Sequence, residues 1–154
     1  MSFEIVNGDI TKIKVDAIVN AANVHLIAGA GVCGAIFKAA GYTELQAACD
    51  KVSPIQTGEA VATPAFKLNA KIIIHTAGPI WQGGNNKERQ LLENCYTNSL
   101  KVAVENDCKS IAFPLISSGI YGVPRDVAMD SAKTAIENFL KNNELQVFLV
   151  LFGR

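Results

Sequence analysis

The sequence has no excess of either charge: 14 lysines and arginines stand against 14 aspartates and glutamates, and the formal net charge is zero. General binding to nucleic acid or to an anionic membrane surface depends on a basic patch. The balance therefore argues against a nucleic-acid partner, including single-stranded or poly(A) RNA. An anionic ligand would have to be held by local geometry.

Paired cysteines and long apolar runs are also lacking. The four cysteines do not have the paired spacing of a zinc site or a redox dithiol, and we recognise no secretory signal before them: Cys33, Cys49, Cys95 and Cys108. We therefore expect reduced thiols, a cytoplasmic location and no metal site. The apolar runs are as long as strands, shorter than a bilayer span, so no membrane partner is expected.

Short apolar runs alternate with longer segments of helical period, which is typical of an α/β fold with helices on both faces of a sheet. Strands are expected over residues 3–10, 16–22, 59–64, 70–78, 110–116 and 146–152. Helices are expected over residues 32–40, 42–52, 87–106 and 125–143. The chain ends directly after its last apolar run, so we expect that a closing helix is missing from this sequence.

A glycine-rich loop follows the strand that ends near Ala21 and precedes the helix that begins near Val32. It contains Gly29, Gly31 and Gly34 at the junction. Glycine lets backbone N–H groups approach a ligand, and a helix N-terminus adds a partial positive charge, so the loop favours a phosphate. Its spacing matches neither the P-loop nor the G-x-G-x-x-G pattern. A tight strand-to-helix connection without a ligand is the alternative.

A second such loop spans residues 114–124 and contains Ser117, Ser118, Gly119 and Gly122. In an open α/β sheet, loops that leave the carboxyl ends of neighbouring strands meet at one crevice. Two glycine-rich loops could there hold a diphosphate from two sides, which predicts a nucleotide with a pyrophosphate. A simple turn before a helix remains the alternative for this loop.

Eight segments, in order along nearly the whole chain, resemble those of a macrodomain, the ADP-ribose-binding module: GDIT, DAIVNAAN, GAGVCGAIFKAAG, TGEAV, IIHTAGPIW, CYTNSL, SIAFPLISSGIYGVP and VFLVLF. Within the family, the chain resembles the bacterial branch of O-acetyl-ADP-ribose deacetylases and mono-ADP-ribosyl hydrolases. Its NAANVHL segment is also similar to viral macrodomains. The resemblance implies one macrodomain over residues 1–154. It also implies a three-layer α/β/α sandwich around a mixed, mostly parallel six-stranded sheet.

The resemblance implies that Asp9 accepts the adenine amino group, that Ile10 lines the base and that Phe152 lies against its face. A carboxylate suits an amine donor, and a stacked ring contributes about 1–3 kcal/mol. From the residues alone, Asp9 could instead cap a turn before Thr11. Phe152 could equally belong to the core.

At the other end of the ligand, the resemblance implies that Asn23 bonds the hydroxyls of the distal ribose, beside a wall formed by Ala21 and Ala22. Asn20 is expected to hold the shape of the loop. The implied diphosphate residues are Gly29, Gly31 and Val32 in the first loop and Ser117, Ser118, Gly119, Ile120 and Tyr121 in the second, with Tyr121 also covering the distal ribose.

The chain departs from the hydrolytic bacterial pattern at four positions. Cys33 stands where that pattern has aspartate and Phe37 where it has histidine, and Ala28 and Ala30 replace common glycines. General-base help is worth about 10²–10⁴ in rate, so the missing carboxylate weakens the case for catalysis. Some family members hydrolyse without the aspartate, which fits a water held by Asn23 and activated by the ligand's own phosphate.

Cys33 suggests a further hypothesis, because a thiol in the first turn of a helix can act as a nucleophile. The sequence places no histidine to serve as its base, and inert packing is the alternative. His75 lies inside an apolar strand, so we expect a hydrogen-bonded core residue there. The other histidine, His25, lies in the first loop.

Two functions therefore stay open. One is an enzyme that cleaves an ester at the distal ribose of O-acetyl-ADP-ribose or of mono-ADP-ribosylated acidic side chains. The other is a reader that binds ADP-ribose or ADP-ribosylated protein without turnover. The two loops and Asn23 favour the enzyme, whereas Cys33 and Phe37 favour the reader. We expect the enzyme, with Asn23 as its catalytic residue and no cofactor.

Overall fold

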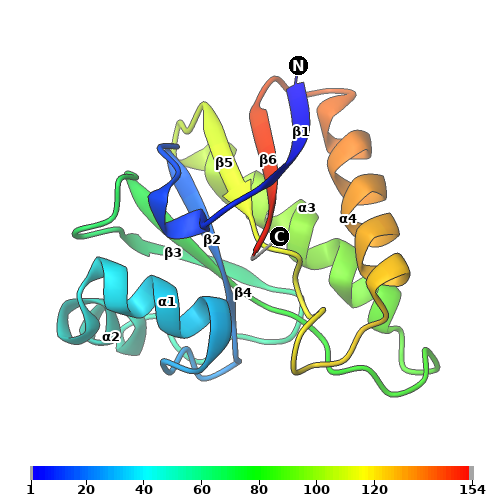
Figure 1. Ribbon diagram of the computed structural model, residues 1–154, viewed down its shortest axis with the longest axis horizontal. Helices are drawn as coiled ribbons and strands as arrows, with labels where there is room; N and C mark the ends of the chain where they lie inside the picture. Colours follow the sequence, from blue (N-terminus) through cyan, green and yellow to red (C-terminus); the bar gives the residue numbers. More distant parts are fainter. Residues whose placement is uncertain (1, 153–154) are drawn as a thin grey trace.

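The computed structural model describes residues 2–152 and contains six strands, four α-helices and one short 3-10 helix (Figure 1). Their order is β1 (Ser2–Asn7), η1 (Ile10–Lys12), β2 (Ala17–Ala22), α1 (Gly31–Ala40), α2 (Tyr42–Asp50), β3 (Ala60–Pro64), β4 (Ile72–Ala77), α3 (Glu88–Glu105), β5 (Ser110–Phe113), α4 (Arg125–Leu140) and β6 (Gln146–Leu151). Every expected strand and helix is present. Within the described residues, no helix is both long and apolar enough to cross a bilayer.

Two strands end earlier than the apolar pattern predicts. β1 stops at Asn7 because the Asp9 carboxylate accepts a hydrogen bond from the Thr11 amide at 2.9 Å and so begins η1. β5 stops at Phe113 because the next residue, Pro114, has no amide hydrogen for the ladder. Both early ends leave irregular chain at the same edge of the sheet.

The strand order in the sheet is β1-β6-β5-β2-β4-β3. All neighbouring pairs are parallel except β3 and β4, which run antiparallel. The expected mixed, mostly parallel sheet of six strands is therefore confirmed. The five parallel strands, all but β3, bring their carboxyl ends to one edge.

Helices cover both faces of the sheet, with α1 and α2 on one side and α3 and α4 on the other (Figure 1). Alternate residues of β2 point to opposite layers, Ile18 toward α1 and α2 and Val19 toward α3 and α4. Ile73 and Ile74 of β4 divide in the same way. Because both faces are buried, these strands read as continuous apolar runs. The three-layer prediction is confirmed.

The connections from β2 and β5 leave the sheet in opposite directions. β2 leads into α1 on one face, whereas the adjacent strand β5 leads into α4 on the other. Neighbouring strands whose connections part in this way form a topological switch point, where α/β proteins bind ligands. The two glycine-rich loops flank this point.

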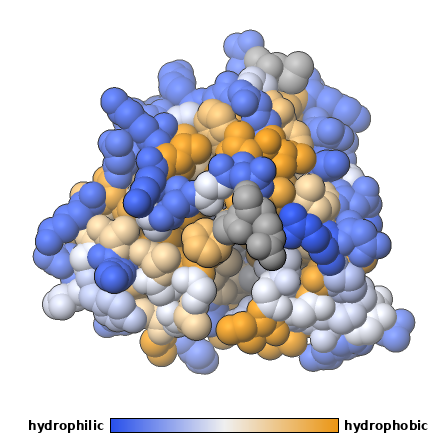
Figure 2. All heavy atoms as spheres, viewed as in Figure 1, coloured by the Kyte–Doolittle hydropathy of each residue, from blue (hydrophilic) through white to orange (hydrophobic). Residues whose placement is uncertain are grey.

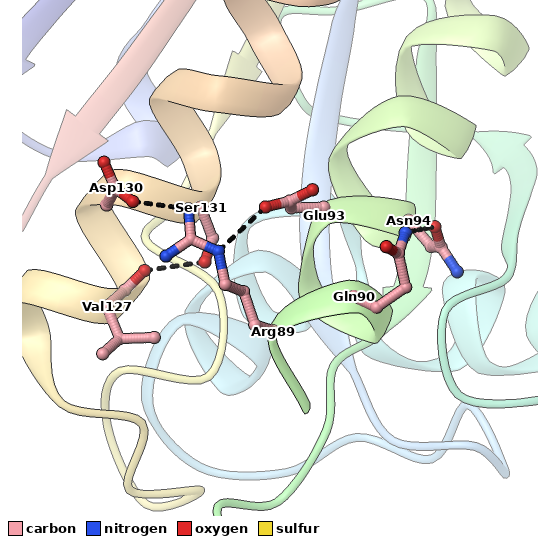
Figure 3. A network of polar contacts seen from close by, with 7 residues as sticks. All are labelled: Arg89, Gln90, Glu93, Asn94, Val127, Asp130 and Ser131. Atoms are coloured by element: carbon pink, nitrogen blue, oxygen red, sulfur yellow. Dashed lines mark hydrogen bonds and ion pairs between the residues drawn. The ribbon is translucent and has the colours of Figure 1, made fainter. Parts of the chain in front are cut away.

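The outer faces of α3 and α4 are linked by polar side chains (Figure 3). Arg89 of α3 bonds Glu93 one turn along at 3.0 Å and also reaches Asp130 of α4. The Ser131 hydroxyl of α4 donates to the Val127 carbonyl at 2.7 Å. The Arg89 side chain is 46% exposed, and such surface pairs contribute only about 0–1 kcal/mol. Apolar packing therefore holds the two helices together.

Candidate ligand-binding cleft

A cleft of about 700 Å³ opens at the switch point between the two loops. In Figure 2, pale and orange residues lie along the lower part of the molecule, where Figure 1 shows the loops before α1 and α4. All the residues to which the resemblance assigns a ligand contact line it: Asp9, Ile10, Ala21, Ala22, Asn23, Gly29, Gly31, Val32, Ser117, Ser118, Gly119, Ile120, Tyr121 and Phe152. The fold thus brings segments from four parts of the chain into one site, and their individual roles stay predictions.

The first loop presents unpaired backbone amides to the cleft. Helix α1 has no side-chain cap, because Ala30 occupies its N-cap position. Within the described residues, the amides of Gly29 through Cys33 make no hydrogen bond. Gly31 has φ of 62°, a left-handed conformation that glycine adopts at little cost. An anion at this helix N-terminus would satisfy several of these donors at once.

The second loop has the same property in a different shape. The amides of Gly119, Ile120 and Tyr121 have no hydrogen-bond partner among the described residues, and all three line the cleft. Ser117 adopts φ of 64°, which is uncommon for a residue with a side chain. The Val123 amide donates to the Ser117 carbonyl at 3.0 Å and closes the turn.

Side chains and backbone from other elements hold the second loop in place. The fully buried Tyr96 of α3 donates its hydroxyl to the Pro114 carbonyl at 3.3 Å and accepts from the Ile116 amide at 3.0 Å. The Trp81 amide donates to the Tyr121 carbonyl at 2.8 Å. The loop is therefore anchored at both ends before any ligand binds, which lowers the entropy cost of binding.

At one end of the cleft lie Asp9 and Phe152. Asp9 Oδ1 accepts from the Thr11 amide at 2.9 Å and from the Thr11 hydroxyl at 2.6 Å, so the turn-capping alternative holds. The hydroxyl bond of Thr11, followed by its amide bond, lowers the pKa of Asp9. Oδ2 receives no hydrogen bond within the described residues. Phe152 is 69% exposed at the end of β6, so the alternative that it belongs to the core is wrong.

Asn23 directs its side chain into its own loop. Its Nδ2 donates to the Ile27 carbonyl at 2.7 Å, and its Oδ1 accepts from the amides of His25 and Ile27 at 3.1 and 3.2 Å. Asn23 thus holds the shape of its own loop, in addition to Asn20, whose Nδ2 donates to Cys33 Sγ at the start of α1. The second N–H of the Asn23 amide makes no hydrogen bond with the described residues, and Asn23 lines the cleft.

Beneath the loop, a buried polar network centres on His75. The Thr63 hydroxyl donates to the Pro64 carbonyl, so it accepts from His75 Nε2–H at 2.9 Å. His75 Nδ1 then accepts from Asn20 Nδ2 at 3.0 Å. The expectation that His75 is a hydrogen-bonded core residue is confirmed, since its exposure is 0%. The network ties β2 to β4 directly under the cleft.

Cys33 lies in the first turn of α1, is 7% exposed and lines the cleft. Its Sγ accepts from Asn20 Nδ2 at 3.7 Å and donates toward the Ile27 carbonyl at 4.0 Å. No histidine nitrogen contacts the thiol, because both ring nitrogens of His75 are engaged elsewhere. Phe37 is packed in the core at 1% exposure and faces no ligand. Neither substituted position supplies a base.

Sequence reasoning missed Arg125 as a lining residue. It is the first residue of α4 and, among residues 2–152, the single basic side chain that lines the cleft. Its position directly after Pro124 at a helix start was visible, but its direction depends on how α4 packs. Across residues 2–152, no three His, Cys, Asp or Glu side chains come together in a way that could hold a metal ion.

The fold and the cleft define a class of protein. A mostly parallel α/β sandwich whose switch-point cleft is lined by unpaired amides is a binding domain for an anionic ligand of nucleotide size. The family model described as Macro domain matches residues 19–132. The chain belongs to the Macro domain family, as its sequence motifs predict.

Known relatives agree with this assignment. The chain is 48% identical over 155 residues to a Salmonella newport protein named O-acetyl-ADP-ribose deacetylase, covering 97% of this chain and 86% of the relative. A solved mutant macrodomain of Oceanobacillus iheyensis with ADPR is 42% identical, with a TM-score of 0.90 and coverage of 96% of this chain and 83% of that chain. A Trypanosoma brucei macrodomain in complex with ADP-ribose is 33% identical, with a TM-score of 0.89 and coverage of 97% and 63%.

The His75 network predicts an acid-sensitive fold. Burial lowers the pKa of His75 to about 4, whereas an unfolded histidine titrates near pH 6.5. The unfolded chain therefore binds a proton that the folded protein excludes, and stability rises with pH across this range. We expect the free energy of unfolding to fall by up to about 3 kcal/mol between pH 6.5 and pH 4, measured by urea denaturation.

The two histidines of the sequence provide the control. In a His75→Gln variant, the free energy of unfolding should no longer depend on pH between 6.5 and 5, a range in which few carboxylates titrate. A variant of the exposed histidine, His25→Gln, should keep this dependence. A slope that survives in His75→Gln, or that disappears in His25→Gln, would contradict the role assigned to the buried ring.

Proposed function

We propose that this chain binds ADP-ribose and hydrolyses an ester at its distal ribose. The observation that carries the proposal is the convergence of two anchored loops with unpaired amides on one cleft, with Asn23 and Tyr121 beyond them. The relatives named as O-acetyl-ADP-ribose deacetylases and the solved macrodomain complexes support it. The substrates are O-acetyl-ADP-ribose or mono-ADP-ribosylated acidic side chains of proteins.

The strand order suggests how the ligand lies. Asp9 follows β1 and Asn23 follows β2, and β6 and β5 lie between those strands. Three strand spacings of about 4.8 Å separate the two positions by about 14 Å. Adenine would lie between Asp9 and Phe152, the diphosphate between the two loops, and the distal ribose near Asn23. Arg125 adds one cation to a site whose remaining anion donors are backbone amides.

In the reaction, the oxygen of a water molecule forms a bond to the acyl carbon, and the bond from that carbon to the ribose oxygen breaks. One proton of the water goes to the ribose oxygen and the other leaves with the acid. The charged residues lining the cleft are Asp9 and Arg125, and Asp9 is far from Asn23. We therefore assign Asn23 to positioning the water and a ligand phosphate oxygen to accepting its proton.

A reader without turnover is the second candidate. The observation in its favour is that Cys33 and Phe37 are both packed side chains, so the chain offers no carboxylate or histidine at these two positions. The two candidates share the same cleft and differ only in catalysis.

We further propose that residues 1–154 form one macrodomain, that modified proteins are among its partners and that it works in the cytoplasm. All four cysteines are free and buried thiols, which fits a reducing compartment.

Hydrolysis is tested by following release of labelled ADP-ribose from a glutamate-linked substrate and of acetate from O-acetyl-ADP-ribose. We expect turnover by the natural chain and a loss of at least about tenfold in kcat/KM for Asn23→Ala, because water positioning is lost. Asn98→Ala is the matched control, since that amide also bonds a backbone carbonyl, Gly58 at 2.8 Å, outside the cleft. Tight ADP-ribose binding with no release above the Asn23→Ala level would establish the reader instead.

The first loop is tested at Gly34. A Cβ at this position would lie 2.5 Å from the Gly29 carbonyl oxygen, so Gly34→Ala must push the loop away from α1. Overpacking costs about 1–3 kcal/mol, and we expect a loss of ADP-ribose affinity of about tenfold or more by isothermal titration calorimetry. Lys38→Ala, an exposed change in the same helix, should leave the affinity unaltered. Undiminished affinity in Gly34→Ala would show that the loop does not hold the ligand.

Cys33 is expected to be a packing residue. The Cys33→Ala variant should retain kcat within about threefold, whereas loss of a covalent nucleophile would reduce it by orders of magnitude. Mass spectrometry of the natural chain during turnover provides the second readout. An acyl adduct on Cys33 together with an inactive variant would make the thiol the nucleophile.

A further inference from the structure

A second cavity of about 520 Å³ adjoins the ligand cleft. Asn23, Gly78 and Tyr121 line both cavities, so they meet at the position proposed for the distal ribose. The second cavity extends away from the diphosphate loops, toward β4 and the start of α3. A group esterified to the distal ribose has this cavity directly beyond it.

The Glu88 carboxylate and the amide side chains of Gln82 and Asn86, which line this cavity, make hydrogen bonds within the loop before α3. The Glu88 carboxylate accepts from the amides of Gln82, Gly84 and Asn86 at 2.7, 3.0 and 2.7 Å. Burial would raise the pKa of Glu88, but these amides and its own lower it to about 2. Asn86 Nδ2 also donates to Gln82 Oε1. These bonds hold the loop between β4 and α3 and occupy both oxygens of the Glu88 carboxylate.

The surface that remains for a ligand is mainly apolar. Its walls include Val24 from the first loop, Pro79 and Ile80 after β4, and Leu91 of α3. Ile80 is 57% exposed, although most large apolar side chains of this chain are buried. No lysine or arginine of the part of the chain that the structure describes lines the cavity. The apolar walls favour an uncharged, apolar occupant.

The cavity is also far larger than an acetyl group requires. Pockets of about 300–1,000 Å³ hold whole small molecules, whereas acetyl has only three non-hydrogen atoms. A peptide would fit by size, but each of its residues brings an N–H and a C=O group that need partners. Of the polar side chains that line the cavity, those of Asn23, Gln82, Asn86 and Glu88 already bond within the protein. Few groups therefore remain for a peptide of several residues.

We propose that this cavity, here called the acyl chamber and lined by Val24, Pro79, Ile80 and Leu91, binds the acyl chain of O-acyl-ADP-ribose esters longer than acetyl. Butyryl and hexanoyl esters are of this class. The inference rests on the proposed function, because it needs the distal ribose near Asn23. If the inference holds, the length of the acyl chain affects which substrates the protein binds.

The test measures binding, so that it does not depend on turnover. Isothermal titration calorimetry compares ADP-ribose with analogues whose acetyl, butyryl or hexanoyl group is attached through an amide nitrogen in place of the ester oxygen. Burying a methylene in an apolar site strengthens binding by up to about fourfold. We expect affinity to rise from acetyl to butyryl to hexanoyl.

Two variants test whether the rise in affinity with chain length arises in the acyl chamber. Ile80→Ser should flatten the dependence on chain length, judged relative to ADP-ribose on the same variant. Val104→Ser, which removes a 41% exposed apolar side chain of α3 outside both cavities, should leave the dependence intact.

Three other outcomes would each contradict the acyl chamber. Equal affinity for all three analogues, with ADP-ribose still bound, would overturn the acyl chamber alone. Failure of ADP-ribose itself to bind would overturn the proposed function and the chamber together. A peptide-linked analogue that binds more tightly than the hexanoyl analogue, with no effect of Ile80→Ser, would assign the cavity to the modified protein instead.

Discussion

The structure depends on one constraint: backbone amides at the ends of parallel strands need an acceptor that the chain itself does not supply. In the first loop, the amides from Gly29 to Cys33 have no partner, and in the second loop those from Gly119 to Tyr121 have none within the described residues. Unpaired amides are costly away from water, and a diphosphate satisfies several together. The charge balance of the sequence is consistent with this means of anion recognition, because amides bind an anion without adding net charge.

Such loops can serve as a binding site only if they hold their shape without the ligand. Residues packed below and beside the loops, which do not themselves line the cleft, meet this requirement. His75 and Asn20 fasten β2 to β4 under the first loop. Tyr96 and the Trp81 amide fasten the second loop. These buried polar groups thus lie next to the site, where they rigidify it.

Much of this architecture could be predicted from sequence. Strands buried on both faces read as apolar runs, and glycines after two of them marked the loops, so the position of Gly29 and Gly119 in one cleft followed from how parallel sheets are built. Three details of the site were not disclosed by the sequence. The direction of Arg125, the bonds of Asn23 within its own loop and the pairing of Glu88 beside a second cavity depend on packing that no local pattern encodes.

The most direct test of this account is a crystal structure of the chain with ADP-ribose. The account predicts diphosphate oxygens about 2.7–3.2 Å from amide nitrogens in both loops, with the distal ribose next to Asn23. A diphosphate held by the Arg125 guanidinium alone, or a nucleotide lodged away from the two loops, would contradict it.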